Sequence, residues 1–190
     1  MSPDGTQIRR FTTEASRDIL PSWSLDGKFI YFGSDRSGRY EVWKQPVAAG
    51  AAWQVTRNGG VAAFESADGR ELYYAKSTPL RGIFCVPVSQ KEADSPETPV
   101  LPQIDSAMWG NWAAGPHGIW YLEKVRESRP SVAAIMFFDF STKTSREIGR
   151  TTAVPAIGDS GLAVSPDERK LLYAQIDRAG SNIFIADTFR

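Results

Sequence analysis

The sequence predicts an all-β fold, a β-propeller of about four four-stranded antiparallel blades, and three observations support this prediction. A turn motif recurs at nearly constant intervals, an apolar motif recurs in step with it, and the apolar runs have the length and composition of strands. The 190 residues also divide into about four units of the roughly 40 to 50 residues that one blade requires. We found no helical periodicity, so residues 1–190 are treated as a single propeller region.

The first motif is a Ser-x-Asp-Gly turn followed by an aromatic-rich run, found at 24–32 and 66–74, without its Gly at 165–173, and in degenerate form at 115–122. The acidic position, which is His in the third copy, is occupied by Asp26, Asp68, His117 and Asp167, separated by 42, 49 and 50 residues. An Asp side chain bonds the backbone of a tight turn, and the Gly that follows supplies a positive φ. Each copy therefore predicts a turn that leads into a strand, and this explanation is preferred to a calcium or catalytic role for the carboxylates.

The second motif is an apolar pair about 16 residues after the first, at 42–43, 83–84, 135–136 and 183–184. A third column, at 54–56, 100–101 and 147–148, supplies a further strand. These columns predict blades at residues 21–56, 62–101, 107–149 and 160–190, the last with three strands. The run at 29–32 is apolar at consecutive positions, so both faces of its strand require burial, as expected where blades pack face to face. Five tryptophans are predicted to pack between blades: Trp23, Trp43, Trp109, Trp112 and Trp120.

The N-terminal segment does not fit a complete blade, because Asp4 precedes Asp26 by only 22 residues. Residues 5–12 align instead with residues 50–56. We therefore predict that residues 6–12 form the outer strand of an incomplete blade, or of a blade that closes by pairing with the three-stranded last unit.

The composition limits the possible partners. Lys and Arg number 22, as do Asp and Glu, so the formal net charge is zero and nothing drives the chain toward nucleic acid or an anionic membrane. We expect no direct nucleic acid binding. A single cysteine excludes an internal disulfide, and the sequence shows no signal peptide or transmembrane segment. The chain as given is expected to be soluble, and neither its compartment nor its oligomeric state is indicated.

A family resemblance follows from residues 21–28 (Pro-Ser-Trp-Ser-Leu-Asp-Gly-Lys), then Ile-Tyr-Phe at 30–32, Ser-Gly at 37–38 and Val-Trp at 42–43. This pattern resembles the repeat of TolB-like propellers, also called the WD40-like (PD40) repeat. The C-terminal unit is most similar to the propeller part of bacterial winged-helix regulators. The resemblance implies six or more blades in such relatives, so this chain is either a fragment of a larger propeller or a shortened copy that pairs with another chain.

No catalytic constellation is evident. His117 is the only histidine and Cys85 the only cysteine, which removes His-pair zinc sites and dithiol sites, and the segment 158–162 lacks the final Gly of a serine hydrolase elbow. Cys85 lies inside an apolar run and is predicted to be a buried, unreactive thiol. We expect a protein that is not an enzyme and that has no cofactor and no metal site.

One surface stands out by charge. The loops between the second and third strands of each unit emerge at one end of the propeller, and they carry more basic than acidic residues. The candidate partner-binding residues are Arg36, Arg39, Lys76, Arg81, Arg126, Arg129 and Arg178. A basic loop face can receive a protein partner or a small anionic ligand. The predicted function is a non-catalytic module for protein interaction or ligand sensing. The alternatives are the sensory part of a winged-helix DNA-binding regulator and the propeller gate of a prolyl-oligopeptidase-like peptidase without its hydrolase domain.

Overall fold

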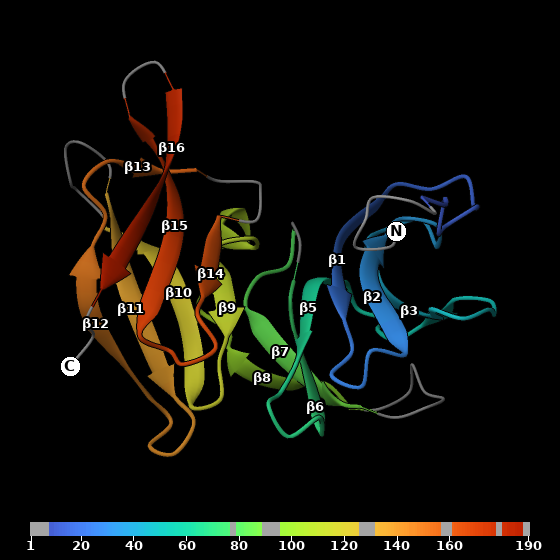
Figure 1. The fold of residues 1–190 in the computed structure, drawn as a ribbon. Helices are drawn as coiled ribbons and strands as arrows, with labels where there is room; N and C mark the ends of the chain where they lie inside the picture. Colours follow the sequence, from blue (N-terminus) through green and yellow to red (C-terminus); the bar gives the residue numbers. More distant parts are fainter. Residues whose placement is uncertain are drawn as a thin grey trace.

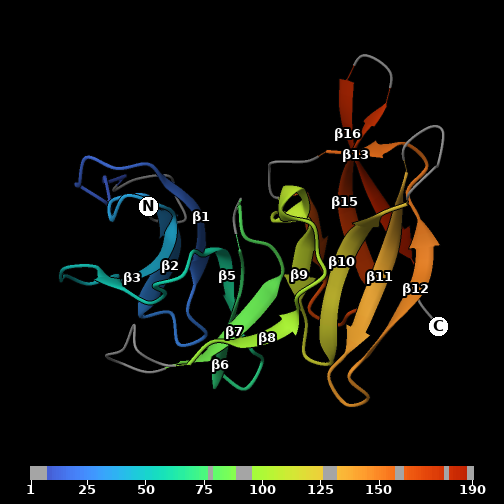
Figure 2. The same cartoon turned by 180° about the vertical axis from the view of Figure 1, so that it is seen from behind.

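The computed structural model describes residues 8–76, 79–88, 96–125, 132–156, 161–177 and 180–187. These residues form four four-stranded antiparallel sheets in a four-blade propeller arrangement, which confirms the predicted fold class (Figures 1 and 2). The first blade comprises β1 (Asp18–Trp23), β2 (Phe29–Ser34), β3 (Glu41–Pro46) and β4 (Trp53–Gln54). The second comprises β5 (Val61–Glu65), β6 (Glu71–Ala75), β7 (Ile83–Pro87) and β8 (Thr98–Leu101).

The third blade comprises β9 (Trp112–Ala114), β10 (Gly118–Lys124), β11 (Ala133–Asp139) and β12 (Thr144–Arg150), and it follows a short 3-10 turn, η1 (Ser106–Met108). The fourth comprises β13 (Val154–Pro155), β14 (Leu162–Val164), β15 (Lys170–Asp177) and β16 (Gly180–Asp187). Strands β13 and β14 both pair with the same edge of β15, while β16 pairs with its other edge. The last blade therefore has a divided inner strand, where the sequence predicted a single one.

The repeated turn has the same hydrogen bonds in different blades, as the sequence predicts. In the first blade the Ser24 hydroxyl donates to Asp26 (2.7 Å), and the Ser24 and Asp26 oxygens accept from the backbone N–H groups of Phe29 (2.9 Å) and Lys28 (3.0 Å). Gly27 has a φ of +68°. The turns at Asp68 and Asp167 repeat the pattern. Each Asp is thus used by its own turn.

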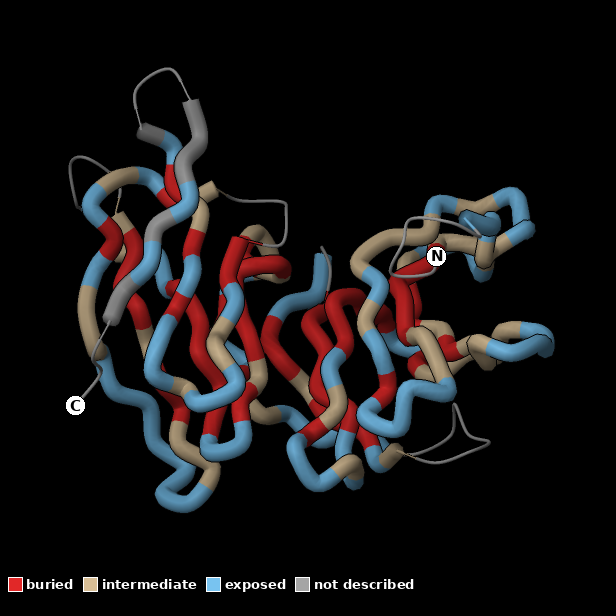
Figure 3. Tube along the Cα trace, in the orientation of Figure 1, coloured by how far each residue is buried: buried red, intermediate tan, exposed pale blue. Residues whose placement is uncertain are grey.

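The core lies between the faces of successive blades (Figure 3), whose inner strands contact one another in the order β1, β5, β9 and β14. In each of the first three blades an aromatic residue of the repeated run lies on the face that is turned toward the next blade. These residues are Tyr31, Tyr73 and Trp120, and all three are buried. Trp112 and Trp120 are buried as predicted. Trp23 is not, because its side chain lies on the side of the first blade that is turned away from the second blade.

The N-terminal segment lies against the first blade. Residues 8–12 form no strand; the Arg9 guanidinium donates to the Val47 carbonyl (2.6 Å) and the Gln45 amide donates to the Phe11 carbonyl (3.4 Å). Figure 1 shows the N-terminal segment and β16 at opposite ends of the row of blades. Residues 8–12 therefore do not make the pairing with the last blade that the sequence suggested for residues 6–12, because the two ends are too far apart. Residues 1–7 are outside the described part of the chain.

No helix among the described residues is long and apolar enough to cross a membrane.

Candidate functional site

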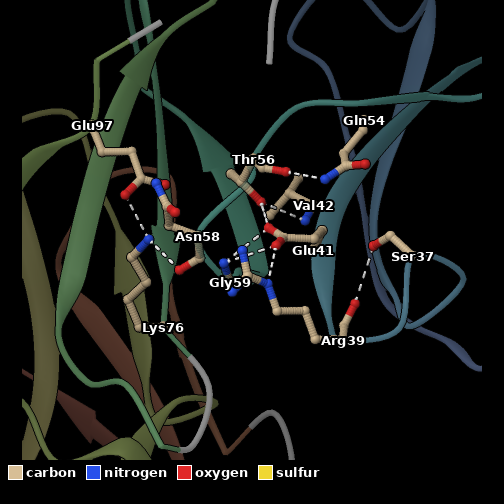
Figure 4. Close-up of polar contacts among 10 residues, drawn as sticks. All are labelled: Ser37, Arg39, Glu41, Val42, Gln54, Thr56, Asn58, Gly59, Lys76 and Glu97. Atoms are coloured by element: carbon tan, nitrogen blue, oxygen red, sulfur yellow. Dashed lines mark hydrogen bonds and ion pairs between the residues drawn. The ribbon is translucent and has the colours of Figure 1, made fainter. Parts of the chain in front are cut away.

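The loop face of the first two blades is built on a hydrogen-bonded platform. The loop between β2 and β3 and the connection from the first blade to the second meet where the Gly60 N–H donates to the Tyr40 carbonyl (3.0 Å). Strand β3 begins at Glu41, directly after this loop, so the first side chain of the strand points toward the connection (Figure 4). The loop and the connection thus form one surface.

Glu41 is the centre of this platform. Its carboxylate is buried and accepts hydrogen bonds from the Thr56 hydroxyl (2.6 Å) and from the Gly59 N–H (3.0 Å to each oxygen). The Nε of Arg39 forms an ion pair with the same carboxylate at 2.6 Å (Figure 4). The Thr56 hydroxyl in turn accepts from the Val42 N–H (2.9 Å). A buried carboxylate with this many donors fixes the backbone of both loops.

Lys76 continues the network into the second blade. Its ammonium is buried and contacts the Glu97 carboxylate at 2.7 Å and the Asn58 carbonyl at 2.8 Å (Figure 4). It also lies over the rings of Tyr74 and Phe84, 5.1 and 4.8 Å from their centroids. The repeat pattern predicts that Lys76 is an exposed loop cation. The structure corrects this, because its charge is needed to balance Glu97 between the blades.

An open hollow of about 530 Å³ lies beside the platform. It is lined by Ser37, Gly38, Arg39, Glu41, Gln54 and Arg57. Among the described residues that line it, the hollow has the side chains of two arginines, one serine hydroxyl and one carboxylate, that of Glu41. Arg39 remains 56% exposed while its Nε pairs with Glu41. Because a guanidinium carries five N–H donors in a planar fork, the lining suits a carboxylate or another planar anion.

The other predicted partner-binding residues do not join this hollow. Arg36 is largely buried and does not line the hollow. Its guanidinium pairs with Asp18 (3.2 Å) and stacks over the rings of Phe32 and Trp43, 5.2 and 4.8 Å from their centroids. It stabilises the first blade. Arg81 is exposed on the segment between β6 and β7. Arg126, Arg129 and Arg178 lie outside the described residues. Partner binding by these residues remains a prediction.

Arg57 lines the hollow but is not among the predicted partner-binding residues. It lies on the connection between the first and second blades, which the repeat pattern places at the same end of the propeller as the loops between second and third strands. The predicted partner-binding residues all come from the latter loops. Including the blade-to-blade connections would have found it.

The described residues contain no group of three or more His, Cys, Asp and Glu side chains that could hold a metal ion. Cys85 is buried, as predicted, and burial raises the pKa of its thiol to about 12. A thiol in this state is a poor nucleophile near neutral pH.

The fold is similar to that of solved propellers. TolB from Acinetobacter baumannii aligns with a TM-score of 0.69 and 14% sequence identity, over 88% of this chain and 40% of that one. A chain of a nidogen/laminin complex gives a TM-score of 0.61 with 12% identity, over 90% and 61% of the two chains. Oligogalacturonate lyase from Vibrio parahaemolyticus gives 0.59 with 18% identity, over 81% and 44%. TolB-like propellers are thus among the structural neighbours. A scan against protein families found no match.

This chain spans between 40% and 61% of the length of these three proteins. At such low identities the likeness establishes the fold alone. The three neighbours include an enzyme by name as well as TolB, and function resides in sites carried by a fold rather than in the fold itself. Function is therefore inferred from the loop face.

Proposed function

We propose that this protein is a non-catalytic propeller module that binds an acidic partner, a carboxylate-bearing protein segment or a small organic anion, in the hollow beside Glu41. The observation that carries the proposal is the pair of guanidinium groups, Arg39 and Arg57, on the rim of an open hollow with a rigid floor. Binding sites are commonly built from loops that a rigid scaffold positions. Here the Glu41 network supplies that rigidity.

The non-catalytic part of the proposal is supported by the chemistry of the hollow. An acid–base or nucleophilic mechanism needs a nucleophile within hydrogen-bond reach of a base. The carboxylate at the hollow, Glu41, is already engaged by Thr56, Gly59 and Arg39. His117 is at another place in the fold, in the third blade, where it contacts Glu168. The structural neighbours, which include a lyase, do not decide the question.

Two other functions remain predictions: the sensory part of a winged-helix DNA-binding regulator, and the gate of a peptidase. Both assign the propeller a recognition role within a longer protein. The encoded sequence on either side of these 190 residues would distinguish them. A regulator would have a winged-helix DNA-binding domain there, whereas a peptidase would have a hydrolase domain.

The proposal is tested by titrating the purified chain with a fluorescein-labelled hexaglutamate peptide and, in a separate experiment, with citrate. Arg57→Gln should weaken binding of one or both about tenfold, equivalent to about 1.4 kcal/mol. Arg70→Gln is the matched control, because Arg70 is an exposed arginine on the turn between β5 and β6, at the other end of the blades. Binding that falls with rising salt and is lost with Arg57 but not with Arg70 supports the proposal. Equal affinity in wild type and Arg57→Gln overturns it.

The absence of catalysis is tested separately. The wild-type chain is assayed for cleavage of polygalacturonate and of a generic peptide substrate library. Turnover that one point substitution abolishes would overturn the non-catalytic assignment.

A further inference from the structure

The last blade has an apolar face that no other part of the described chain covers. Strand pairing places Leu172 opposite Ile185 and Ala174 opposite Ile183, and residues directly opposite in antiparallel strands point to the same face. On this face Leu172 is 41%, Ile185 55% and Ile183 79% exposed. The opposite face of the blade, with Leu171 and Tyr173, is buried against the third blade.

The repeat shows what this face is built for. Leu172 occupies the position in its blade that Tyr31, Tyr73 and Trp120 occupy in the first three: each lies one residue before the last aromatic side chain of the repeated run and pairs with the inner strand of its blade. Each of those three residues packs on the following blade and is no more than 8% exposed. The last blade therefore presents the side that elsewhere in this chain meets the face of another blade.

The free face is also hollowed and its edge is open. A depression of about 270 Å³ is lined by Ala163, Leu172, Ala174 and Ile183 of this face, together with Gly161, Leu162 and Tyr173. In the first three blades the third strand is paired with an outer fourth strand, but among the described residues β16 pairs only with β15. An uncovered face beside an unpaired strand edge is a site for strand addition and for aggregation unless it is covered.

The first blade carries the complementary surface. Trp23 pairs with Ile30, so it lies on the side of the blade that is turned away from the second blade, and it is 62% exposed. In the other blades the residues that match Ile30 on this side, Leu72, Ile119 and Leu171, are buried against the preceding blade. The exposed Trp23 therefore lies on a blade face that no other described part of this chain covers.

The N-terminal segment lies beside that surface. Residues 8–12 contact β3 through Gln45, whose register partner is Ile30 on the same side. Residues 5–12 align in sequence with residues 50–56, which contain β4, the outer strand of the blade that precedes the second blade. The segment thus stands where the outer strand of a preceding blade belongs.

We propose that two copies of this chain associate head to tail, with the last blade of each copy packed on the first blade of the other. The Leu172–Ile183–Ile185 face then covers Trp23, and residues 8–12 of one copy lie along the free edge of β16 in the other. A second copy is favoured as the occupant because this chain itself bears both halves of the junction, and because the new contact continues the blade-to-blade interface already present in the fold. Two such junctions close the pair, so neither copy retains an open end.

Sedimentation velocity on the purified 190-residue chain tests this proposal. Wild type should sediment as a dimer at a chain concentration of about 10 μM, which requires a dissociation constant in the micromolar range or below. Ile183→Asp and Trp23→Asp should each raise the dimer dissociation constant at least tenfold. Leu80→Asp is the control, because Leu80 is an exposed leucine on the segment between β6 and β7, outside both surfaces. Circular dichroism on each variant verifies that the blades remain folded.

An equimolar mixture of the two weakened variants gives the decisive result. Ile183→Asp retains an intact first blade and Trp23→Asp an intact last blade, so head-to-tail pairing predicts that the mixture recovers dimer through one undamaged junction. A monomeric wild type overturns the proposal. The proposal is also overturned if Trp23→Asp dimerises like wild type and the mixture does not restore dimerisation of Ile183→Asp. That result indicates that two last blades pair with each other.

Discussion

The imidazole Nδ1 of His117 in the third blade is hydrogen-bonded to the carboxylate of Glu168 in the fourth. The two residues occupy neighbouring positions in the repeated turn, in which Asp26, Asp68 and Asp167 bond their own backbone. Where the third copy has His instead of Asp, the side chain reaches across to the next blade. The hydrogen bond to Glu168 raises the pKa of His117, and the charge of that carboxylate adds to the effect.

This pair should make stability depend on pH. A raised pKa means that the folded state holds the imidazole proton more tightly than the unfolded chain does, so the stabilisation is fully present below the unfolded pKa of about 6.5. It is lost as the pH rises through the folded-state pKa. We expect the thermal midpoint of wild type to exceed that of His117→Gln at pH 5.5 and the two to converge at pH 9. Thermal denaturation followed by circular dichroism measures this.

Glu168→Gln is the partner control for this pair. It should remove the same pH dependence, and the double variant should behave like either single variant if the two side chains act together. A difference between wild type and His117→Gln that is constant from pH 5.5 to 9 would show that the pair contributes nothing through protonation.

The platform at the loop face should depend on Glu41. Replacing it with Ala leaves the Thr56 hydroxyl and the Gly59 N–H without their buried acceptor, which should destabilise the fold by about 2–4 kcal/mol. Glu41→Gln keeps an acceptor at the same place and should cost less than Glu41→Ala. Urea denaturation monitored by tryptophan fluorescence gives both values. If the two variants were equally stable, the carboxylate would not be what holds the loops together.

The repeated turn provides a prediction about local structure. The Ser24 hydroxyl is buried and accepts from the Phe29 N–H at 2.9 Å, so Ser24→Ala leaves a backbone donor at the start of β2 without its partner. The expected loss of stability is about 1–2 kcal/mol. Ser37→Ala is the control, since the Ser37 hydroxyl makes an exposed, longer contact of 3.4 Å with the Arg39 carbonyl and should change stability by less than about 0.5 kcal/mol. Equal effects of the two substitutions would refute the role assigned to the turn.

The sequence was informative wherever the repeat determines local structure. Each Asp turn and each apolar run of strand length is a short-range signal, and these signals place the strands and the buried face of each blade. The divided inner strand of the last blade was not predicted, because the turn signal Gly-Asp-Ser-Gly at 158–161 does not show that the residues before and after it pair with the same strand. The position of residues 8–12 could not be predicted either, because an alignment with residues 50–56 identifies the kind of strand but not the blade that it joins.

The candidate site was predicted less well for a related reason. Loop charge can be counted from sequence, but the partner of each charge depends on side chains that are distant in the chain. Lys76 is balanced by Glu97, 21 residues further on, and Arg36 by Asp18, 18 residues earlier. Of the predicted cations that the structure describes, Arg39 alone lines the hollow, and Arg57 joins it from a connection that was not considered.

Two buried lysines provide the last prediction, because the ammonium of Lys76 contacts a carboxylate, whereas Glu65 and Asp26 act on the ammonium of Lys44 only through their charge. Lys76 forms a close ion pair with Glu97, whereas Lys44 lies over the rings of Phe29 and Tyr31, 4.3 and 4.9 Å from their centroids. Burial lowers the pKa of Lys44, which means that its charge is less favourable in the folded state than in the unfolded chain. Removing that charge with a residue of similar shape should therefore relieve a cost.

We expect Lys44→Met to leave stability unchanged or to raise it by up to about 2 kcal/mol, since methionine fills the same apolar space without a charge to desolvate. Lys76→Met should instead destabilise by about 3–5 kcal/mol, because it leaves the Glu97 carboxylate without its cation between the blades. Both values come from urea denaturation at pH 7. The advantage of Lys44→Met should also shrink as the pH rises through the folded-state pKa of Lys44, where the wild-type ammonium loses its proton and with it the cost of burial. A Lys44→Met variant as unstable as Lys76→Met would show that the contact with the two rings outweighs desolvation at this site.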